Sequence, residues 1–235
     1  NIAADTLQKM VEVAIGAHQD NKKDPDYIHH ALSELAQRGK ESSILTQLTD
    51  KELTALKTNR LKPLLRGLLN YKRRIAYVGL RSPSEAGRLV SQGKRHYKDP
   101  PAYQPLKFVR PTKTRVLFTH RDMVQSRVGL SAPDEVLDPD HAVDYQYYGS
   151  YLGGGMSSVI FQEIREARSL AYSAHGGYAS GARKGDENRV YGALGCQADK
   201  TYEATELLAR LLKDPPLSEK RFTETAKAIE EGYRT

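Results

Sequence analysis

The chain has 235 residues, which suits one or two domains, and 39% of them are hydrophobic, which is enough to build a core. Its 36 Lys and Arg against 29 Asp and Glu give a net charge of +7, but these charges are interleaved, so no concentrated nucleic-acid surface is indicated. No apolar run approaches the roughly 20 residues of a membrane span. A single cysteine excludes an internal disulfide and a multi-cysteine zinc site.

The first part of the chain is predicted to be helical. Apolar residues recur at helical spacing over about 3–18 and over 28–36, and Thr49 opens a capping-box pattern. A stripe of leucines over 61–69 predicts another helix, with Pro63 in its first turn, where a proline loses no hydrogen bond. Together these segments indicate a mainly helical N-terminal region.

A change of composition marks the expected domain boundary. Residues 75–79 form a short β-type run, and a helix is predicted over 84–92. Residues 93–112 hold four prolines, a pattern typical of a linker or an edge segment rather than of a central strand. We therefore place a linker at 93–112.

Beyond the linker the pattern changes from helices to strands. Residues 113–120 are rich in β-formers and residues 124–130 alternate between apolar and polar, so the two runs are predicted to form an antiparallel hairpin. The remaining predicted elements are helices at about 138–152 and 157–169, strands at 171–180 and 188–197, and helices at 199–213 and 218–234. Strands paired as hairpins favour an α+β fold, a two-layer domain in which helices cover one face of a mostly antiparallel sheet.

The histidines form no recognised zinc motif. A helical zinc site of the zincin type requires two histidines at fixed spacing with a neighbouring glutamate, and none of the seven histidines adjoins a glutamate. His29 and His30 with Glu34 are the nearest cluster, but adjacent histidines point to different sides of a helix, so we interpret them as solvated surface. A zinc site built from this chain alone is not expected.

Residues 153–155 are three consecutive glycines that follow a predicted helix. A phosphate-binding loop would follow a strand and carry a lysine or a defined glycine spacing, and neither is present. We interpret the glycines as a helix–helix corner that uses positive φ, with Ser157 or Ser158 capping the next helix. No Gly-x-Ser-x-Gly nucleophile elbow occurs in the chain.

Two residues seven apart carry the candidate chemistry. Arg165 falls late in a predicted helix, and Tyr172 falls at the start of the following strand. In a structural role, Arg165 offsets the helix dipole or pairs with a glutamate, and Tyr172 packs on the sheet. In a functional role, a guanidinium and a phenol hydroxyl that project to one surface would hold a carbonyl oxygen and stabilise an oxyanion. The residues alone leave both interpretations open.

Three nearby segments, taken together, resemble the pitrilysin/insulinase family of zinc metallopeptidases, which includes the mitochondrial processing peptidases. They are Tyr-Leu-Gly-Gly-Gly-Met-Ser-Ser at 151–158, Phe-Gln-Glu-Ile-Arg-Glu at 161–166 and Leu-Ala-Tyr-Ser at 170–173. The strongest match covers about 148–178, and the order of elements over 113–235 agrees with a domain of that family. The resemblance implies a clamshell peptidase of repeated α+β domains, with zinc and a general-base glutamate in one half.

The resemblance assigns this chain to the half that carries no metal. Arg165 and Tyr172 would assist at the substrate carbonyl, and the zinc motif has no counterpart, so the chain alone should be inactive. Residues 1–92 would close a preceding related domain, and 113–235 would form the inactive C-terminal-type domain. No cofactor is expected in this chain, zinc is expected in a partner half that is fused or separate, and the expected substrate is a peptide or protein.

Two other functions remain open at this point. The first is a non-catalytic scaffold or assembly subunit that retains the fold. The second is a basic nucleic-acid-binding module, which the dispersed charge disfavours. No membrane span is expected under any of these interpretations.

Overall fold

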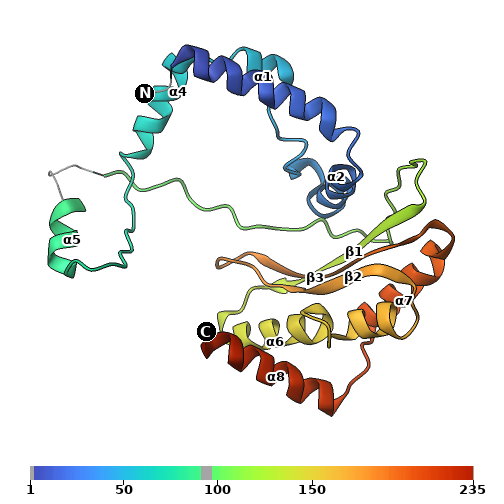
Figure 1. The fold of residues 1–235 in the computed structure, drawn as a ribbon. Helices are drawn as coiled ribbons and strands as arrows, with labels where there is room; N and C mark the ends of the chain where they lie inside the picture. The colour runs from blue at the N-terminus through green and yellow to red at the C-terminus, as the bar shows by residue number, and fades with distance from the viewer. Residues whose placement is uncertain (1–2, 91–96, 235) are drawn as a thin grey trace. The chain divides into compact units, whose positions relative to one another are not determined.

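A computed structural model describes residues 3–90 and 97–234, which form two compact units (Figure 1). One unit comprises residues 1–20 and 48–104, and the other comprises residues 21–47 and 105–235. The end of the helix predicted over 84–92 and the start of the 93–112 linker lie outside the described residues. The assignment of 1–92 and 113–235 to two related domains stays a prediction.

The first unit is mainly helical, as the sequence predicts. Its helices are α1 (Ala4–Asn21), α3 (Asp50–Thr54), α4 (Thr58–Leu68) and α5 (Pro83–Val90). Thr49 and Glu52 form the predicted capping box, with the Thr49 N–H donating to the Glu52 carboxylate at 2.8 Å. Pro63 is not in the first turn of α4, contrary to the prediction, because the helical hydrogen bonds already begin at the Lys57 carbonyl.

Residues 75–79 do not form the predicted strand. They carry no regular secondary structure, and Val78 is 99% exposed. A strand needs a neighbour to pair with, and the described part of this unit offers only an isolated bridge between Tyr71 and Lys98. The leucine stripe of α4 is exposed as well, and Leu64 reaches 68%.

The second unit contains a three-stranded antiparallel sheet, drawn as arrows in Figure 1. Its strands are β1 (Gln125–Val136), β2 (Ala171–Ala179) and β3 (Glu187–Gln197). Their order in the sheet is β1-β3-β2, so β1 and β2 are its edge strands within the described residues. The strands predicted at 171–180 and 188–197 are confirmed to within one residue at each end.

The hairpin predicted at the start of this region is wrong. Residues 113–120 form no strand, and Val116 and Phe118 are 82% and 79% exposed. β1 pairs with the later β3 rather than with its neighbour in sequence. This pairing places Val128 and Leu130 against the core, whereas the side chains of 113–120 meet no apolar surface there.

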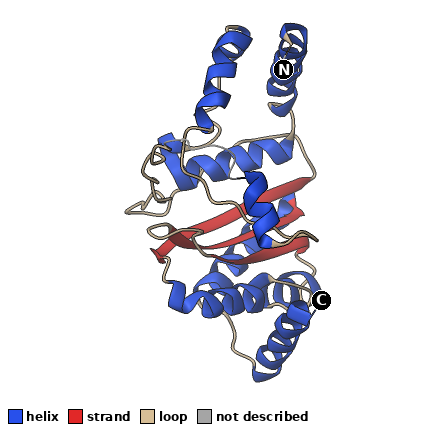
Figure 2. Ribbon diagram, turned by 90° about the vertical axis from the view of Figure 1, so that its left-hand side faces the viewer, coloured by secondary structure: helices blue, strands red, loops and turns tan. Residues whose placement is uncertain are grey.

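Helices cover one face of the sheet, which confirms the predicted α+β class. α6 (Ala142–Gly153) and α7 (Thr201–Lys213) pack on the strands, and α8 (Glu219–Arg234) packs on α6 (Figure 2). The most deeply buried side chains of the core between these layers are Leu152, Ile160, Ile164 and Leu208. The opposite face is partly covered by α2 (Pro25–Arg38), an arrangement that the sequence pattern did not predict. None of the described helices is long and apolar enough to cross a membrane.

Candidate functional site

The glycine corner at the end of α6 is a point of close packing. Gly153 lies against β2, where a Cβ would overlap the carbonyl oxygen of Gly176. The predicted use of positive φ is wrong: Gly154 has a φ of −83°, and none of the three glycines lies in the left-handed region. The missing side chain instead lets the helix end approach β2, which fixes where the next segment starts.

The serines after the corner do not cap the following helix with their side chains, contrary to the prediction. The Ser158 hydroxyl donates to the Gly155 carbonyl at 2.6 Å, so it closes the turn instead. Ser157 contributes its carbonyl, which accepts from Arg221 Nε at 3.0 Å. These contacts anchor the corner to α8 as well as to the sheet.

The segment that carries Arg165 is π-helical over Phe161–Glu166. Its end is closed by two backbone hydrogen bonds, from the Ser169 N–H to the Arg165 carbonyl at 3.0 Å and from the Leu170 N–H to the Ile164 carbonyl at 3.1 Å. The two bonds are nested as in a Schellman motif, but each spans one residue more than in that motif, and the residue at the Ser169 position adopts the left-handed region. Ser169 does so, with a φ of 50°, although glycine is the usual residue there.

A β-bulge places Tyr172. In the β2–β3 ladder Ala171 pairs with Cys196 and Ser173 pairs with Gly195, so Tyr172 is an extra residue on β2. Its ring lies over Gly195, where a Cβ would come within 2.6 Å of the ring. The bulge and the bare glycine together turn this side chain onto the sheet face opposite the core, and it remains 51% exposed.

The Arg165 side chain is also half-exposed, at 48%. Its guanidinium carbon lies 4.9 Å from the centre of the Phe161 ring, and Nε is 3.6 Å from the carboxylate of Glu166. Across residues 3–90 and 97–234, no hydrogen bond, ion pair or ring contact joins Arg165 to Tyr172, and the Tyr172 hydroxyl has no hydrogen-bond partner. Both side chains therefore present unused donors to solvent.

Three departures from regular backbone fall within twelve residues. The π-helix at 161–166, the left-handed Ser169 and the bulge at Tyr172 lie in sequence around the two candidate donors. Features of this kind cost stability and are concentrated at functional sites. Sequence spacing identified the two donors, but it gave no sign of the roles of Ser169 and Gly195.

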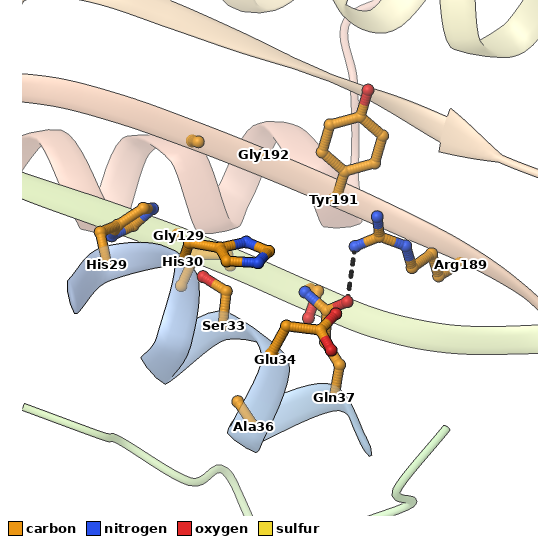
Figure 3. A pocket seen from close by; sticks show the side chains of 13 residues that line it. His29, His30, Ser33, Glu34, Ala36, Gln37, Gly129, Arg189, Tyr191 and Gly192 are labelled. Atoms are coloured by element: carbon orange, nitrogen blue, oxygen red, sulfur yellow. Dashed lines mark hydrogen bonds between the residues drawn. The ribbon is translucent and has the colours of Figure 1, made fainter. Parts of the chain in front are cut away.

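The described residues contain no group of three His, Cys, Asp or Glu that could hold a metal ion. The interpretation of His29 and His30 as solvated surface is correct for His30 but not for His29. The His29 ring is half-buried and rests on Gly129 of β1, because α2 packs on the sheet (Figure 3). No local sequence pattern predicts that α2 packs on the sheet.

Comparison with known proteins establishes the family. The model of the peptidase M16 inactive domain matches residues 81–228, which is more than half of the chain, and the chain belongs to this family. A curated relative, an uncharacterised zinc protease of Streptomyces coelicolor, is 34% identical over 112 residues, which cover 46% of this chain and 24% of that protein. The resemblance derived from the sequence is thereby confirmed.

Solved structures share the fold. A peptidase M16 inactive domain from Pseudomonas fluorescens aligns with a TM-score of 0.68 at 18% identity, over 97% of this chain and 56% of that chain. The periplasmic protease PqqL from Escherichia coli aligns with a TM-score of 0.74 at 13% identity, over 99% of this chain and 26% of that one. The chain thus spans less than two thirds of the length of these relatives.

Proposed function

We propose that this chain is the non-metal half of a zinc-dependent peptidase and that Arg165 and Tyr172 present hydrogen-bond donors to the carbonyl of a bound peptide. The observation that carries the proposal is the run of backbone irregularities over 161–172, which leaves both side chains half-exposed. Membership of the peptidase M16 inactive-domain family, together with a zinc protease among the relatives, supports the class of reaction.

The two side chains suit the stabilisation of an oxyanion. Arg165 offers N–H donors in a planar fork, and Tyr172 offers one O–H donor. Donors directed at a carbonyl oxygen orient it in the bound peptide and strengthen as negative charge develops on that oxygen, which lowers the barrier. The Phe161 ring beside the guanidinium restricts the orientations that Arg165 can adopt.

The residues of this chain do not fit zinc, since its described part lacks a three-ligand group. In this proposal the zinc-bearing half, fused or separate, holds the metal, which supplies Lewis acidity and an activated water when bound. The role of the present chain is to bind and orient the peptide. Alone, it is expected to bind peptides without hydrolysing them.

An extended peptide would add to the outer edge of β2. This strand ends the sheet on one side within the described residues, so it offers backbone groups for an additional ladder. Strand addition supplies main-chain hydrogen bonds that do not depend on peptide sequence. Tyr172 lies at the start of β2, so the end of a peptide added there would lie next to this residue, whose ring covers Gly195 on the sheet face.

The test combines the chain with the zinc-bearing half and replaces Tyr172 by Phe, which keeps the ring over Gly195 and removes the hydroxyl. We expect kcat to fall by about 100-fold or more while KM changes little, as for the loss of one oxyanion donor. Tyr202→Phe, at an 80% exposed tyrosine of α7, is the matched control. An unchanged kcat for Tyr172→Phe would overturn the assignment.

A non-catalytic scaffold is the second candidate function. It is favoured by the lack of a metal-binding group among the described residues, which leaves this chain dependent on another for any hydrolysis. A scaffold would still assemble with its partner, but substitutions at Arg165 and Tyr172 would alter no activity of the assembly. The same variants therefore distinguish the two functions.

We also propose that residues 1–92 complete a preceding related domain and that residues 93–112 link it to 113–235. Exposed apolar surface supports this division, both on α4 and in the run 75–79. Soluble proteins seldom leave such surface uncovered, so an adjoining part of the preceding domain would cover it.

A further inference from the structure

The turn that follows Arg165 is held by the core at its two ends only. Ile164 and Leu170 are both buried, and the Leu170 N–H donates to the Ile164 carbonyl at 3.1 Å. Residues 165–169, which lie between them, are all exposed. The core therefore fixes where the turn begins and ends, and contacts on its exposed side determine the path of the backbone in between.

The side chain of Arg168 makes such a contact. Its Nη1 atom donates to the backbone carbonyl of Glu163 and to the carboxylate of the same residue, both at 2.8 Å. One residue earlier, the Gln162 carbonyl accepts from the Ala167 N–H at 2.8 Å, which is the i→i+5 spacing of a π-helix. The same spacing leads from Glu163 to residue 168, where the side chain acts as the donor. Arg168 thus extends the π-helical bonding pattern by one carbonyl.

The contact between Arg168 and Glu163 is too exposed to contribute much to folding. The two side chains are 43% and 28% exposed. Ion pairs at the surface add little stability, because water screens the charges and because ordering two long side chains costs entropy. The same bonds nevertheless restrain the backbone on both sides of Arg165, which lies between the two residues in sequence. They are therefore better suited to orienting Arg165 than to stabilising the fold.

The orientation of Arg165 depends on the π-helical form of the turn. A π-helix bonds residue i to i+5, whereas an α-helix bonds i to i+4, so the two forms have different numbers of residues per turn. A change from one to the other would alter the direction in which the Arg165 side chain leaves the helix. Tyr172 would not follow, because the bulge on β2 fixes it independently. The two donors keep their relative placement only while the π-helical turn persists.

We infer that Arg168 is a positioning residue: through Glu163 it holds the π-helical turn in the form that directs the Arg165 guanidinium to the substrate carbonyl. The inference rests on the proposed function, since it requires Arg165 to act on a bound peptide. Arg168 acts through the backbone and makes no contact with the substrate. Its loss lowers the fraction of molecules in which Arg165 is in place, which reduces kcat and changes KM little.

A double-mutant cycle on the chain combined with the zinc-bearing half provides the first test. We expect Arg168→Gln to lower kcat by about tenfold and Arg165→Gln to lower it by about 100-fold or more. The double variant should match Arg165→Gln alone, because Arg168 has nothing to position once Arg165 is gone. A purely structural Arg168 would lower kcat by the same factor in both backgrounds, and that result would overturn the inference.

Two further variants test the source of the effect. One nitrogen of Arg168 makes both bonds to Glu163, so the single ammonium of Arg168→Lys can replace it and should restore most of kcat. Arg210→Gln makes the same charge change at an exposed arginine of α7 and should leave kcat unchanged. If Arg168→Lys is no more active than Arg168→Gln, the contacts with Glu163 are not the source and the inference fails.

Hydrogen exchange of the chain alone tests the inference without any measurement of activity. The Ser169 and Leu170 amides close the turn, so both should exchange about fivefold or more faster in Arg168→Gln if the side chain holds it. The amides of β3 report on global stability and should exchange as in the unaltered chain. Unchanged exchange at Ser169 and Leu170 would overturn the inference.

The inference and the proposed function can fail separately. If Arg165→Gln lowers kcat and Arg168→Gln does not, the function stands and the positioning role is wrong. If Arg165→Gln leaves kcat unchanged, the proposed role of Arg165 is wrong, and the positioning role is wrong with it even where exchange shows that Arg168 holds the turn.

Discussion

Ser169 occupies a position for which glycine is better suited. It lies in the left-handed region with a φ of 50°, where a side chain costs roughly 1–2 kcal/mol. Its neighbour Leu170 and the π-helical Ile164 are both buried, at 6% and 0% exposure, and they hold the turn in place. The strain therefore lies within the short connection between Arg165 and Tyr172, where it sets the direction in which the chain enters β2.

Ser169→Gly is expected to stabilise the chain by about 0.5–1 kcal/mol, because relief of the strain exceeds the entropy that glycine adds to the unfolded state. Urea unfolding measures the difference. Ser173→Gly, in β2 and without positive φ, is the matched control and should destabilise by about 0.5–1 kcal/mol. A loss of stability in Ser169→Gly would show that the hydroxyl makes a stronger contribution than the torsion.

Gly153→Ala is expected to lower the free energy of unfolding by about 2 kcal/mol or more. The new Cβ would overlap the Gly176 carbonyl, and a strand backbone cannot rotate away as a side chain can. Gly155→Ala, two residues along the same corner, has nothing within 4 Å of its Cβ and should leave stability nearly unchanged. Chemical denaturation of both variants tests this, and equal effects would contradict the close approach of α6 to β2.

At the scale of elements, the attachment of α2 to the sheet is expected to depend on pH. The pKa of His29 is lowered in the folded chain, so the unfolded state binds more protons at pH values between that lowered pKa and the ordinary value of 6.5. The stability contributed by neutral His29 is therefore present above about pH 6.5 and is lost as the pH falls further.

The urea concentration at the midpoint of unfolding should decrease as the pH is lowered from about 8 to about 5. His29→Gln should make this concentration depend less on pH. His120→Gln, at an exposed histidine, is the control and should retain the full dependence. A dependence that is identical in all three proteins would exclude His29 as its source.

The strands that were predicted wrongly share one cause. A composition rich in β-formers indicates that the side chains suit a pleated surface, but a strand also needs a neighbouring strand to pair with. Neither 75–79 nor 113–120 has a neighbouring strand in the described chain. The helices and the β2–β3 hairpin were predictable because their hydrophobic period matches the face that each one buries. Their partners lie close in sequence or on a common core.

Only the local features of the candidate site could be predicted from the sequence. Arg165 and Tyr172 stand out by residue type and spacing, but the bulge that turns Tyr172 exists only in register with β3. The role of His29 depends on Gly129, one hundred residues later, and no local pattern contains that contact. Long-range packing therefore determines which of several equally polar histidines rests on the sheet.

At the scale of the whole molecule, the exposed leucines of α4 are expected to govern solubility rather than stability. Leu64 and Leu68 are 68% and 64% exposed, so replacing both by Glu should change Tm little while lowering dye binding and self-association. Calorimetry and light scattering measure these effects. Leu217→Glu, at a 91% exposed leucine in the other unit, serves as the control for added charge. A fall in Tm of several degrees would show that the leucines are packed.

The long separation between α2 and its partners affects the order in which the chain acquires its structure. The hydrogen bond between Gln37 and Arg189 spans 152 residues, and contacts across such separations form slowly because a large loop must close first. During synthesis α2 emerges before β1 and β3 exist, so it has no sheet to pack on until the later strands have been made. The attachment of α2 to the sheet is therefore a late event, which can occur only when most of the chain has been synthesised.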